Sequence, residues 1–583
     1  MTWSILQRTF NPILFLVLIV LIHLFLISKT FSIDSAGNMR AASAGYGDIP
    51  FHMTEVSKFA FQKQFDFNEP IYDGDRMRYS FLINASSGLI LRFWGNWNFA
   101  MQFPVMLSMA SATFLIFIIY KNLLLSGWRA LAAIVIFLFG AGFGANWHIR
   151  EYLTASMNPN FEGFIKYLVD NTASTITKYD AVFPRQNIAW GTPLSLVFLH
   201  QRSFFAGIII FALFIYFFLK WQRNPRSILM MLFMGILVGI GPLAHFHTFV
   251  VMYIVLFISI LIAIVKEKWV LFERLLLLGL TGFIISVPQL IYLVQGKTNE
   301  VITGSSFFHL RLGWMVQPTI GSVKFNPVDG LFWGEVVPFL SFLWLNFGVI
   351  LPIFLICGFI IYKSSNFRDK FKGIGWWWLT GIVLFLFVQT VRLQPWDYDN
   401  NKVLVYFQFF AAPIFVAFFV WIIERRKLIG NALLAIFLIL ATYSGFVDQI
   451  PRLLVPNNKL PIIFNTDAIA TAKYIKEYIP DGEDLITTST HLNPVSSLAG
   501  RPVLVGYPGW LWTRGINYGK RESDVKLFFS NPETYKFIAD SYGSKYALVD
   551  PPAIFDWDTP VYNFDNNFEL VFEKGGYRIY KLH

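Results

Sequence analysis

Long apolar runs alternate along the chain with short basic segments and longer polar segments. Runs of about 18 or more apolar residues recur, and a helix of that length crosses roughly 30 Å of hydrocarbon. We count eleven candidate spans, at about 12–29, 101–120, 130–147, 203–220, 228–243, 246–265, 275–295, 337–362, 374–392, 403–423 and 429–448. The pattern therefore predicts a polytopic α-helical membrane protein with about 11 transmembrane helices.

The short segments between alternate spans are basic, and one of them carries Lys220, Arg223 and Arg226. Basic loops stay in the cytoplasm, so we expect a cytoplasmic N-terminus and an extracytoplasmic C-terminus. The longer segments 30–100, 148–202, 296–336 and 393–402 then lie outside. The first run could pass for the apolar core of a signal peptide, but residues 28–37 form a weak cleavage site, so we expect a retained helix.

After residue 449 the apolar runs shorten and charges return, which predicts an extracytoplasmic α/β domain over 450–583 after a membrane domain over 1–449. DAIATAKYIKEYI has the apolar spacing of an amphipathic helix, and DLITTST and KYALVD read as buried strands. NPETYKFIADSYG places Asn531 as a helix N-cap and Gly543 at the stop. FELVFEKGGYRIYKL reads as a hairpin around Gly575-Gly576.

Composition agrees with a membrane protein, at 55% hydrophobic residues and a mean hydropathy of +0.52. The net charge of +11 could suggest nucleic acid, but the basic residues lie at the ends of apolar runs, so no nucleic-acid partner is expected. The single cysteine, Cys357, excludes an intrachain disulfide. The chain has no Gly-x-Ser-x-Gly, Cys-x-x-Cys or His-Glu-x-x-His motif.

The first external segment gathers acidic residues beside the membrane, in GYGDIPFHMTEVSKFA and YDGDRMRY. If 49–60 is helical, Asp48, His52 and Glu55 lie on one face, where a carboxylate can act as a general base or hold a divalent cation. We take these three as the candidate catalytic residues; the alternative for Asp48 is a helix N-cap. In YDGDRMRY, a cation site, an anion site at Arg76 and Arg78, and a solvated turn all stay open. Asn84-Ala85-Ser86 matches a glycosylation sequon.

Further polar islands interrupt the apolar pattern and supply candidate substrate-binding residues. The AHFHT pair follows a break at Gly241-Pro242, which either faces a cavity or forms a tight hairpin. The alternatives to a binding role are structural: polar groups with satisfied hydrogen bonds, an Arg202 that snorkels to the membrane surface, and a cap formed by an Asp399–Lys402 salt bridge. The candidates are Arg202, His245, His247, Arg392, Asp397, Asp399, Lys402, Trp510, Trp512 and Arg514.

The chain resembles the GT-C superfamily of integral membrane glycosyltransferases in its retained first helix, acidic first external loop, many spans and external C-terminal domain. GDIPFH, the QRS island, HFHT, QPWDYDNNK and AGRPVLVGYPGWLWTRG also resemble segments of uncharacterised multi-span bacterial proteins placed near that superfamily. The resemblance implies lipid-phosphate-linked sugar donors and an acidic catalytic residue in the first loop, by position Asp48. Here Asp48 is followed by Ile49, whereas protein O-mannosyltransferases have a paired Asp-Glu.

We therefore expect an inverting membrane glycosyltransferase in the cell envelope, in a bacterial inner membrane. It moves a sugar from a polyprenyl-phosphate-linked donor to an acceptor at the external face. Arg202, Arg392 or Lys402 would hold the lipid phosphate, His52, His245 and Asp399 would line the cavity, and the C-terminal domain would select the acceptor. A divalent cation as cofactor, the acceptor and protein partners in the membrane stay open. The alternatives are a transporter or lipid flippase, which predicts two related halves, and a non-enzymatic assembly subunit.

Overall fold

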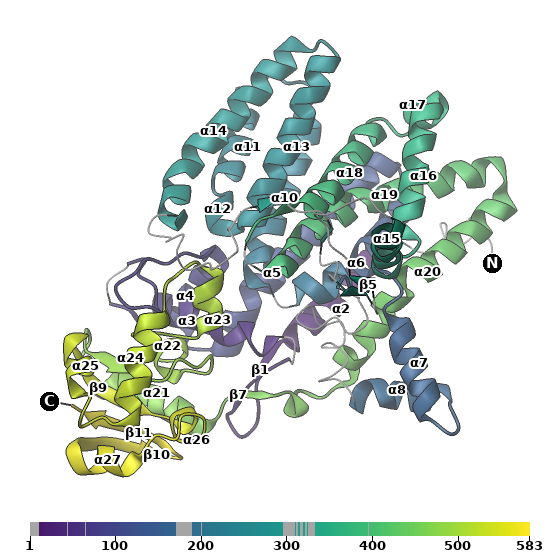
Figure 1. Ribbon diagram of the computed structural model, residues 1–583. Coiled ribbons are helices and arrows are strands. Elements are labelled where there is room, and N and C mark those ends of the chain that lie inside the picture. Colours follow the sequence, from purple (N-terminus) through teal and green to yellow (C-terminus); the bar gives the residue numbers. More distant parts are fainter. Residues whose placement is uncertain are drawn as a thin grey trace. The chain divides into compact units, whose positions relative to one another are not determined.

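The computed structural model describes residues 11–582, except 43–44, 64–65, 171–188, 200, 295–308, 311–312, 315–318, 321–322, 325–332 and 395. The chain packs into two compact units (Figure 1). Unit 1 comprises Met1–Ile27, Met106–Val287 and Phe307–Val455, and unit 2 comprises Ser28–Val105, Pro288–Ser306 and Pro456–His583. The first long polar segment thus belongs to the same unit as the C-terminal part of the chain.

Unit 1 is built from helices. Three of them, α2, α5 and α14, continue into segments of unit 2. The helices are α2 (Pro12–Ser28), α5 (Trp97–Leu124), α6 (Gly127–Phe139), α7 (Ala145–Ala155), α8 (Phe161–Asp170), the π-helix η2 (Leu194–Phe198), α10 (Arg202–Trp221), α11 (Ile228–Gly239), α12 (Gly241–Ala244), α13 (Phe246–Val265), α14 (Trp269–Val294), α15 (Trp333–Phe347), α16 (Ile350–Lys363), α17 (Ser365–Lys370), α18 (Ile374–Thr390), the 3-10 helix η4 (Asp397–Asn400), α19 (Asn401–Arg425) and α20 (Lys427–Leu454). Two-residue strands pair β3 (His309–Leu310) with β6 (Val391–Arg392) and β4 (Thr319–Ile320) with β5 (Val323–Lys324).

Helix α19 is the core of unit 1. Every side chain from Asn401 to Val420 is buried, against α6, α16, α18 and α20. A helix that is apolar on all sides finds a stable place only when protein or lipid covers every face. The phenylalanine-rich sequence after the polar QPWDYDNNK segment is therefore explained by its central position.

In the part of the chain that the structure describes, six helices are long and apolar enough to cross a membrane: α5, α10, α13, α14, α20 and the helix of Tyr398–Arg425 that contains α19. They identify the chain as an integral membrane protein. Four shorter apolar helices, α2, α6, α11 and α18, coincide with further expected spans. By length, the described residues give six spans, or seven with one bent pair, so the predicted number of eleven stays a prediction.

The bent pair corrects the continuous span predicted at 337–362. There α15 ends and α16 begins after a bend of 93°. Gly348 lies between them with φ +50°, a conformation that glycine adopts at little cost. At the other predicted break, α12 connects α11 to α13, and both long helices pack on α10 (Figure 1).

Unit 2 combines two helices of the first polar segment with two sheets. These helices are α3 (Asp48–Phe61) and α4 (Leu82–Trp94), and the expected helix over 49–60 is confirmed. Strands β1 (Phe31–Ile33), β2 (Met39–Ala41) and β7 (Ile462–Phe464) form an antiparallel sheet, so the first segment and the C-terminal segment share it. A second sheet has the order β10 (Glu569–Lys574), β11 (Tyr577–Lys581), β9 (Ser544–Val549) and β8 (Asp484–Ile486), with β8 parallel to β9.

The remaining helices of unit 2 are α21 (Thr466–Tyr478), η5 (Asn457–Lys459), α22 (Pro494–Ser497), α23 (Pro508–Thr513), α24 (Gly519–Ser530), α25 (Lys536–Ser541), α26 (Pro551–Phe555) and α27 (Val561–Asn567). The amphipathic helix, both strands and the hairpin expected here are confirmed, and Gly575 and Gly576 both have positive φ at the turn. The prediction that a helix starts at Asn531 is wrong. Asn531 instead accepts a hydrogen bond from Thr534 N in a turn, and α25 begins at Lys536.

Helix α3 lies at the centre of unit 2, with every side chain from Ile49 to Ala60 buried. Its polar side chains are satisfied by neighbours, as burial requires: Ser57 Oγ donates to Ser497 O at 2.7 Å, and Lys58 pairs with Asp66. Helix α4 packs on α3 at Gly88, where a Cβ would lie 2.5 Å from Phe59 Cβ. The segment that is densest in ionisable groups therefore forms an interior element of unit 2.

Candidate functional site

The predicted site residues fall into two groups, one in each unit. Asp48, His52, Glu55, Trp510, Trp512 and Arg514 belong to unit 2. Arg202, His245, His247, Arg392, Asp397, Asp399 and Lys402 belong to unit 1. The side chain of Asp397 lies outside the described residues, although its backbone forms part of η4.

Asp48 is the first residue of α3 and is partly exposed. The N-cap position is taken by Gly47, so the N-cap alternative for Asp48 is wrong. A carboxylate in the first turn is nevertheless favoured by the partial positive charge of the unpaired N–H groups there. Asp48 thus combines a fixed position on a buried helix with access to solvent.

His52 and Glu55 follow on the same helix and share one partner, Asn84 of α4. Asn84 Nδ2 lies 3.0 Å from His52 Nδ1 and donates to Glu55 Oε2 at 2.6 Å. Since Asn84 is fully buried, the sequon asparagine is a structural link between α3 and α4. The tie is possible because Gly88, one turn further along α4, lets the two helices approach closely.

Arg514 provides the charge that compensates Glu55. Its Nη2 lies 3.6 Å from Glu55 Oε1, and its Nη1 lies 2.6 Å from Glu69 Oε1. Both carboxylates are 0% exposed and Arg514 is 5% exposed. A second arginine, Arg78, donates its backbone N–H to Glu69 Oε2 at 3.4 Å and pairs with Asp75 at 2.7 Å. The result is a buried network of alternating charge.

Aromatic rings cover this network. The guanidinium of Arg514 lies over the rings of Phe51, at 4.2 Å, and Tyr79, at 5.3 Å. Trp510 packs on Phe51 at 5.4 Å between ring centroids, so one of the two expected tryptophans lies next to the network. Trp512 is partly exposed. Such cation–π contacts are strongest where water is excluded, as it is here.

A row of rings leads from Trp510 to the segment before Asp48. Trp510 packs on Tyr507, Tyr507 on His491, and His491 on Tyr46, with centroid distances of 5.4, 5.5 and 5.2 Å. Burial lowers the pKa of His491, so its imidazole is neutral at pH 7. Tyr46 lies two residues before Asp48, and the row therefore forms an aromatic surface beside the start of α3.

In unit 1 the AHFHT pair lies at the start of α13. His245 is the N-cap, and its Nδ1 accepts a hydrogen bond from Thr248 N at 3.3 Å. This acceptor role places the proton of a neutral His245 on Nε2. The rings of His245 and His247 stack at 5.3 Å, and their exposures are 3% and 5%. Within the described part of the chain, neither Nε2 has a hydrogen-bond partner.

Lys402, at the start of α19, belongs to the same group. It is buried and interacts electrostatically with both histidines. Tyr406, one turn along α19, lies 2.5 Å from Thr248 Oγ1, which fixes α13 against α19. Lys402 also pairs with Asp399 at 3.1 Å, so the salt-bridged cap considered from the sequence is present.

Two more arginines of unit 1 carry fixed positive charge at helix and strand ends. Arg392, in β6, and Arg202, at the start of α10, are both buried. Asn400 Nδ2 donates to Val391 O at 2.6 Å and thereby holds the QPWDYDNNK turn against β6. The dense polar turn is therefore an ordered cap on α19.

Some polar groups of the structure were not candidate site residues in the sequence. Glu69 completes the network of unit 2, together with Asn84 and Arg78, which the sequence offered only as a sequon asparagine and as part of an anion site. In unit 1, Ser195 bonds with Asp448, and Arg452 Nη2 lies 3.6 Å from the same carboxylate. Asp448 and Arg452 stand four residues apart at the end of an apolar run, and this spacing was the available signal.

The described residues contain no group of three or more His, Cys, Asp or Glu that could hold a metal ion. The turn of YDGDRMRY, with Gly74 at φ +77°, uses Asp75 as the partner of Arg78. The divalent cation considered from the sequence thus has no cluster of ligands to support it in the described part of the chain.

No protein-family model matches the chain, and no curated protein sequence matches it. Among solved structures, it is similar to the oligosaccharyltransferase of Archaeoglobus fulgidus in the apo form, with 12% identity and a TM-score of 0.47 over 92% of this chain and 69% of that one. It is also similar to that organism's oligosaccharyltransferase AglB in complex with an inhibitory peptide and a dolichol-phosphate, with 11% identity and a TM-score of 0.47 over 94% of this chain and 70% of that one. ArnT from Cupriavidus metallidurans bound to undecaprenyl phosphate has 11% identity and a TM-score of 0.45, and the match covers 98% of both chains.

These solved structures are membrane glycosyltransferases of the GT-C superfamily, the group that the sequence resembles. The identities of 11–12% and the TM-scores of 0.47 and below assign no role to any residue of this chain. Roles here must come from the geometry of the two groups.

Proposed function

We propose that the protein is a membrane glycosyltransferase that moves a sugar from a polyprenyl-phosphate-linked donor to an acceptor at the external membrane face. The observation that carries the proposal is the buried group of His245 and His247, at the start of α13, and Lys402, at the start of α19. It combines two histidine Nε2 atoms that have no hydrogen-bond partner among the described residues with an ammonium group and the positive end of a helix. These are the features of a phosphate site in an apolar setting.

In a direct displacement, an acceptor hydroxyl attacks the anomeric carbon, the bond to the phosphate oxygen breaks, and the lipid phosphate leaves with the electron pair. Negative charge develops on the leaving oxygen, and fixed positive groups lower the energy of that state. Lys402 supplies positive charge there, and Arg202 and Arg392 add to it. The imidazoles of His245 and His247 offer ring N–H donors to the leaving oxygen.

The acceptor proton needs a base, and Asp48 is the candidate. Asp48 is partly exposed at the start of a buried helix, whereas Glu55 is fully buried between Arg514 and Asn84. We therefore assign Glu55, His52 and Arg514 to holding α3 in place, and leave catalysis to Asp48. The rings of Trp510 and Tyr507 offer a surface for the acceptor, and Trp512 belongs to the same segment.

The test uses Asp48→Asn, which keeps the size of the side chain and removes the base. Sugar transfer from a polyprenyl-phosphate-linked donor should fall by about 10²–10⁴-fold, the usual contribution of a general base. Thermal stability should stay near that of the wild type. The matched control is Glu533→Gln, which removes an exposed carboxylate of the same unit and should leave transfer unchanged. Retained transfer in the Asp48→Asn protein would refute the assignment.

A transporter or flippase is the second candidate, because the 93° bend between α15 and α16 is a feature of discontinuous helices that line transport sites. That candidate predicts movement of the lipid-linked sugar across the bilayer in the absence of any acceptor. It also predicts that Asp48→Asn leaves this movement intact. Transfer of the sugar to an acceptor by the purified protein decides against it.

A further inference from the structure

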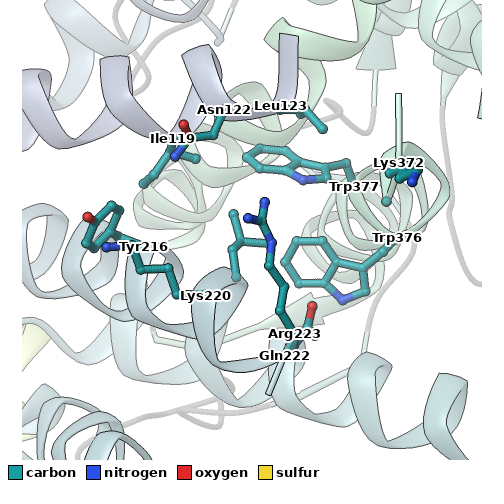
Figure 2. A pocket seen from close by; sticks show the side chains of 12 residues that line it. Ile119, Asn122, Leu123, Tyr216, Lys220, Gln222, Arg223, Lys372, Trp376 and Trp377 are labelled. Atoms are coloured by element: carbon teal, nitrogen blue, oxygen red, sulfur yellow. The ribbon is translucent and has the colours of Figure 1, made fainter. Parts of the chain in front are cut away.

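A cavity of about 750 Å³ opens in unit 1 where α5 and α10 end and α18 begins (Figure 2). We call it the basic cavity. Its lining contains the basic residues Lys220, Arg223 and Lys372. None of the described residues that line it is acidic. The basic cavity is therefore a concave site of one charge sign, with a volume in the range of ordinary ligand pockets.

Among the described residues, no carboxylate neutralises the positive charge of the basic cavity. Lys220 Nζ lies 4.3 Å from the ring centroid of Tyr216, and the described residues place no carboxylate within ion-pair distance of Lys220, Arg223 or Lys372. Figure 2 shows Arg223 extending into the cavity beside the rings of Trp376 and Trp377. Nearby, the acidic Glu424 is already paired with Lys370 and with Arg129.

The rest of the lining is apolar and aromatic. Ile119, Leu123 and Leu219 face the space together with Trp376 and Trp377, and Asn122 and Gln222 add amide groups. Tryptophan and basic residues together mark the level at which helices leave the hydrocarbon and meet the headgroups. The basic cavity thus has a charged part and an apolar part, as an amphipathic ligand has.

The position of the basic cavity agrees with the charge pattern of the sequence. It gathers residues from three separate places that border basic segments: the last turn of α5, the end of α10 with the residues after it, and the residues before α18 with its first turn. Their convergence means that these three segments lie at one end of unit 1. By the positive-inside rule this is the cytoplasmic end. The proposed phosphate-binding residues His245, His247 and Lys402 belong to segments that this rule assigns to the opposite side of the membrane. The basic cavity is therefore not the donor site.

We propose that the basic cavity binds an anionic phospholipid of the cytoplasmic leaflet. Its phosphate lies between Arg223, Lys220 and Lys372, and its acyl chains run along Ile119, Leu123 and the two tryptophans. Basic pockets between helices on this side of a membrane suit anionic headgroups. The bound lipid fills the space between α5, α10 and α18 and neutralises charge for which the described residues provide no carboxylate.

The test measures lipid binding to the purified full chain in neutral detergent, by native mass spectrometry during titration with phosphatidylglycerol. Each basic residue near an anionic lipid contributes roughly fivefold in affinity. The double variant Arg223→Gln/Lys372→Gln should therefore bind about thirtyfold more weakly than the wild type. The charge-preserving variant Arg223→Lys/Lys372→Arg should bind within a few fold of it.

The matched control is Lys266→Gln/Arg274→Gln, which removes the same charge from another basic segment outside the cavity. It should bind phosphatidylglycerol like the wild type. An equal loss in both double variants overturns the proposal in favour of diffuse attraction. Equal binding of phosphatidylcholine overturns headgroup recognition. Competition by inorganic phosphate at equal affinity overturns the lipid assignment and indicates a site for a free anion.

Discussion

Replacement of Arg514 by methionine tests the buried charge network of unit 2. Arg514 lies 2.6 Å from Glu69 and 3.6 Å from Glu55. With an effective dielectric constant of about 20, these distances correspond to attractions of about 6 and 5 kcal/mol before desolvation is subtracted. Because both carboxylates are fully buried, the variant leaves two uncompensated charges in the interior. Breaking a buried pair in this way costs about 3–5 kcal/mol.

The assay is thermal unfolding of the purified protein, with hydrogen exchange read out over α3 and α4. A loss of 3–5 kcal/mol lowers the Tm by about 10 °C for a unit of this size class. Exchange should rise in α3, since Glu55 loses the positive charge that compensates its carboxylate. Adding Glu55→Gln and Glu69→Gln to Arg514→Met removes the uncompensated charges and should restore most of the Tm.

Arg521→Met is the matched control. Arg521 lies in the same unit and donates to Asp73 O at 2.8 Å and Leu504 O at 3.1 Å, with its guanidinium over Tyr72. No carboxylate is left behind when it is removed, so its loss should be smaller and the two Glu→Gln changes should not repair it. If Arg514→Met melts like Arg521→Met, and the Glu→Gln changes repair neither, the charge-network reasoning is wrong.

Two further predictions concern unit 2. Desolvation raises the pKa of the buried Asp550 to about 6. The folded state therefore binds the proton more tightly than the unfolded state does. As the pH rises from about 4 to 6, the free energy of unfolding should fall by about 3 kcal/mol. Asp550→Asn removes this contribution, and its Tm measured from pH 4.5 to 7.5 should diverge from the wild-type curve across that window; parallel curves would contradict the account. Gly88→Ala places a Cβ 2.5 Å from Phe59 Cβ and should destabilise the protein by about 1–3 kcal/mol, whereas Gly519→Ala, with open space around it, should leave the Tm unchanged. Equal Tm values for the two alanine variants would exclude close packing of α4 on α3.

Local signals in the sequence predicted local structure well. The spacing of Asp48, His52 and Glu55 placed α3 to within one residue at each end, and the paired glycines at 575 and 576 placed the hairpin. The signals failed where one residue redirects an otherwise uniform pattern. The chain bends by 93° at Gly348, and only Asn346, two residues earlier, interrupts the apolar pattern near that position.

The partners of the candidate residues were not predictable in the same way. Glu55 meets Asn84 and Arg514, which lie far along the chain, and no periodic pattern links positions in different segments. Burial was also hidden, because a helix with His52, Glu55 and Lys58 reads as an exposed amphipathic element. The burial of α3 depends on its packing against α4 and α22 and on the ion pairs of its side chains, and these contacts form only in the tertiary structure.

Burial and partners separate the roles of residues that share one helix face. Glu55 is fully buried, and both of its oxygens face fixed donors, so taking up a proton during a reaction would break the network that holds α3. Asp48 lies two turns earlier, where the helix starts and solvent has access. A base must exchange protons with a substrate and then with water, and a group sealed inside a charge network cannot do so readily. Asp48 is therefore the residue of this face that is suited to chemistry, and the network beneath it keeps α3 rigid enough to aim it.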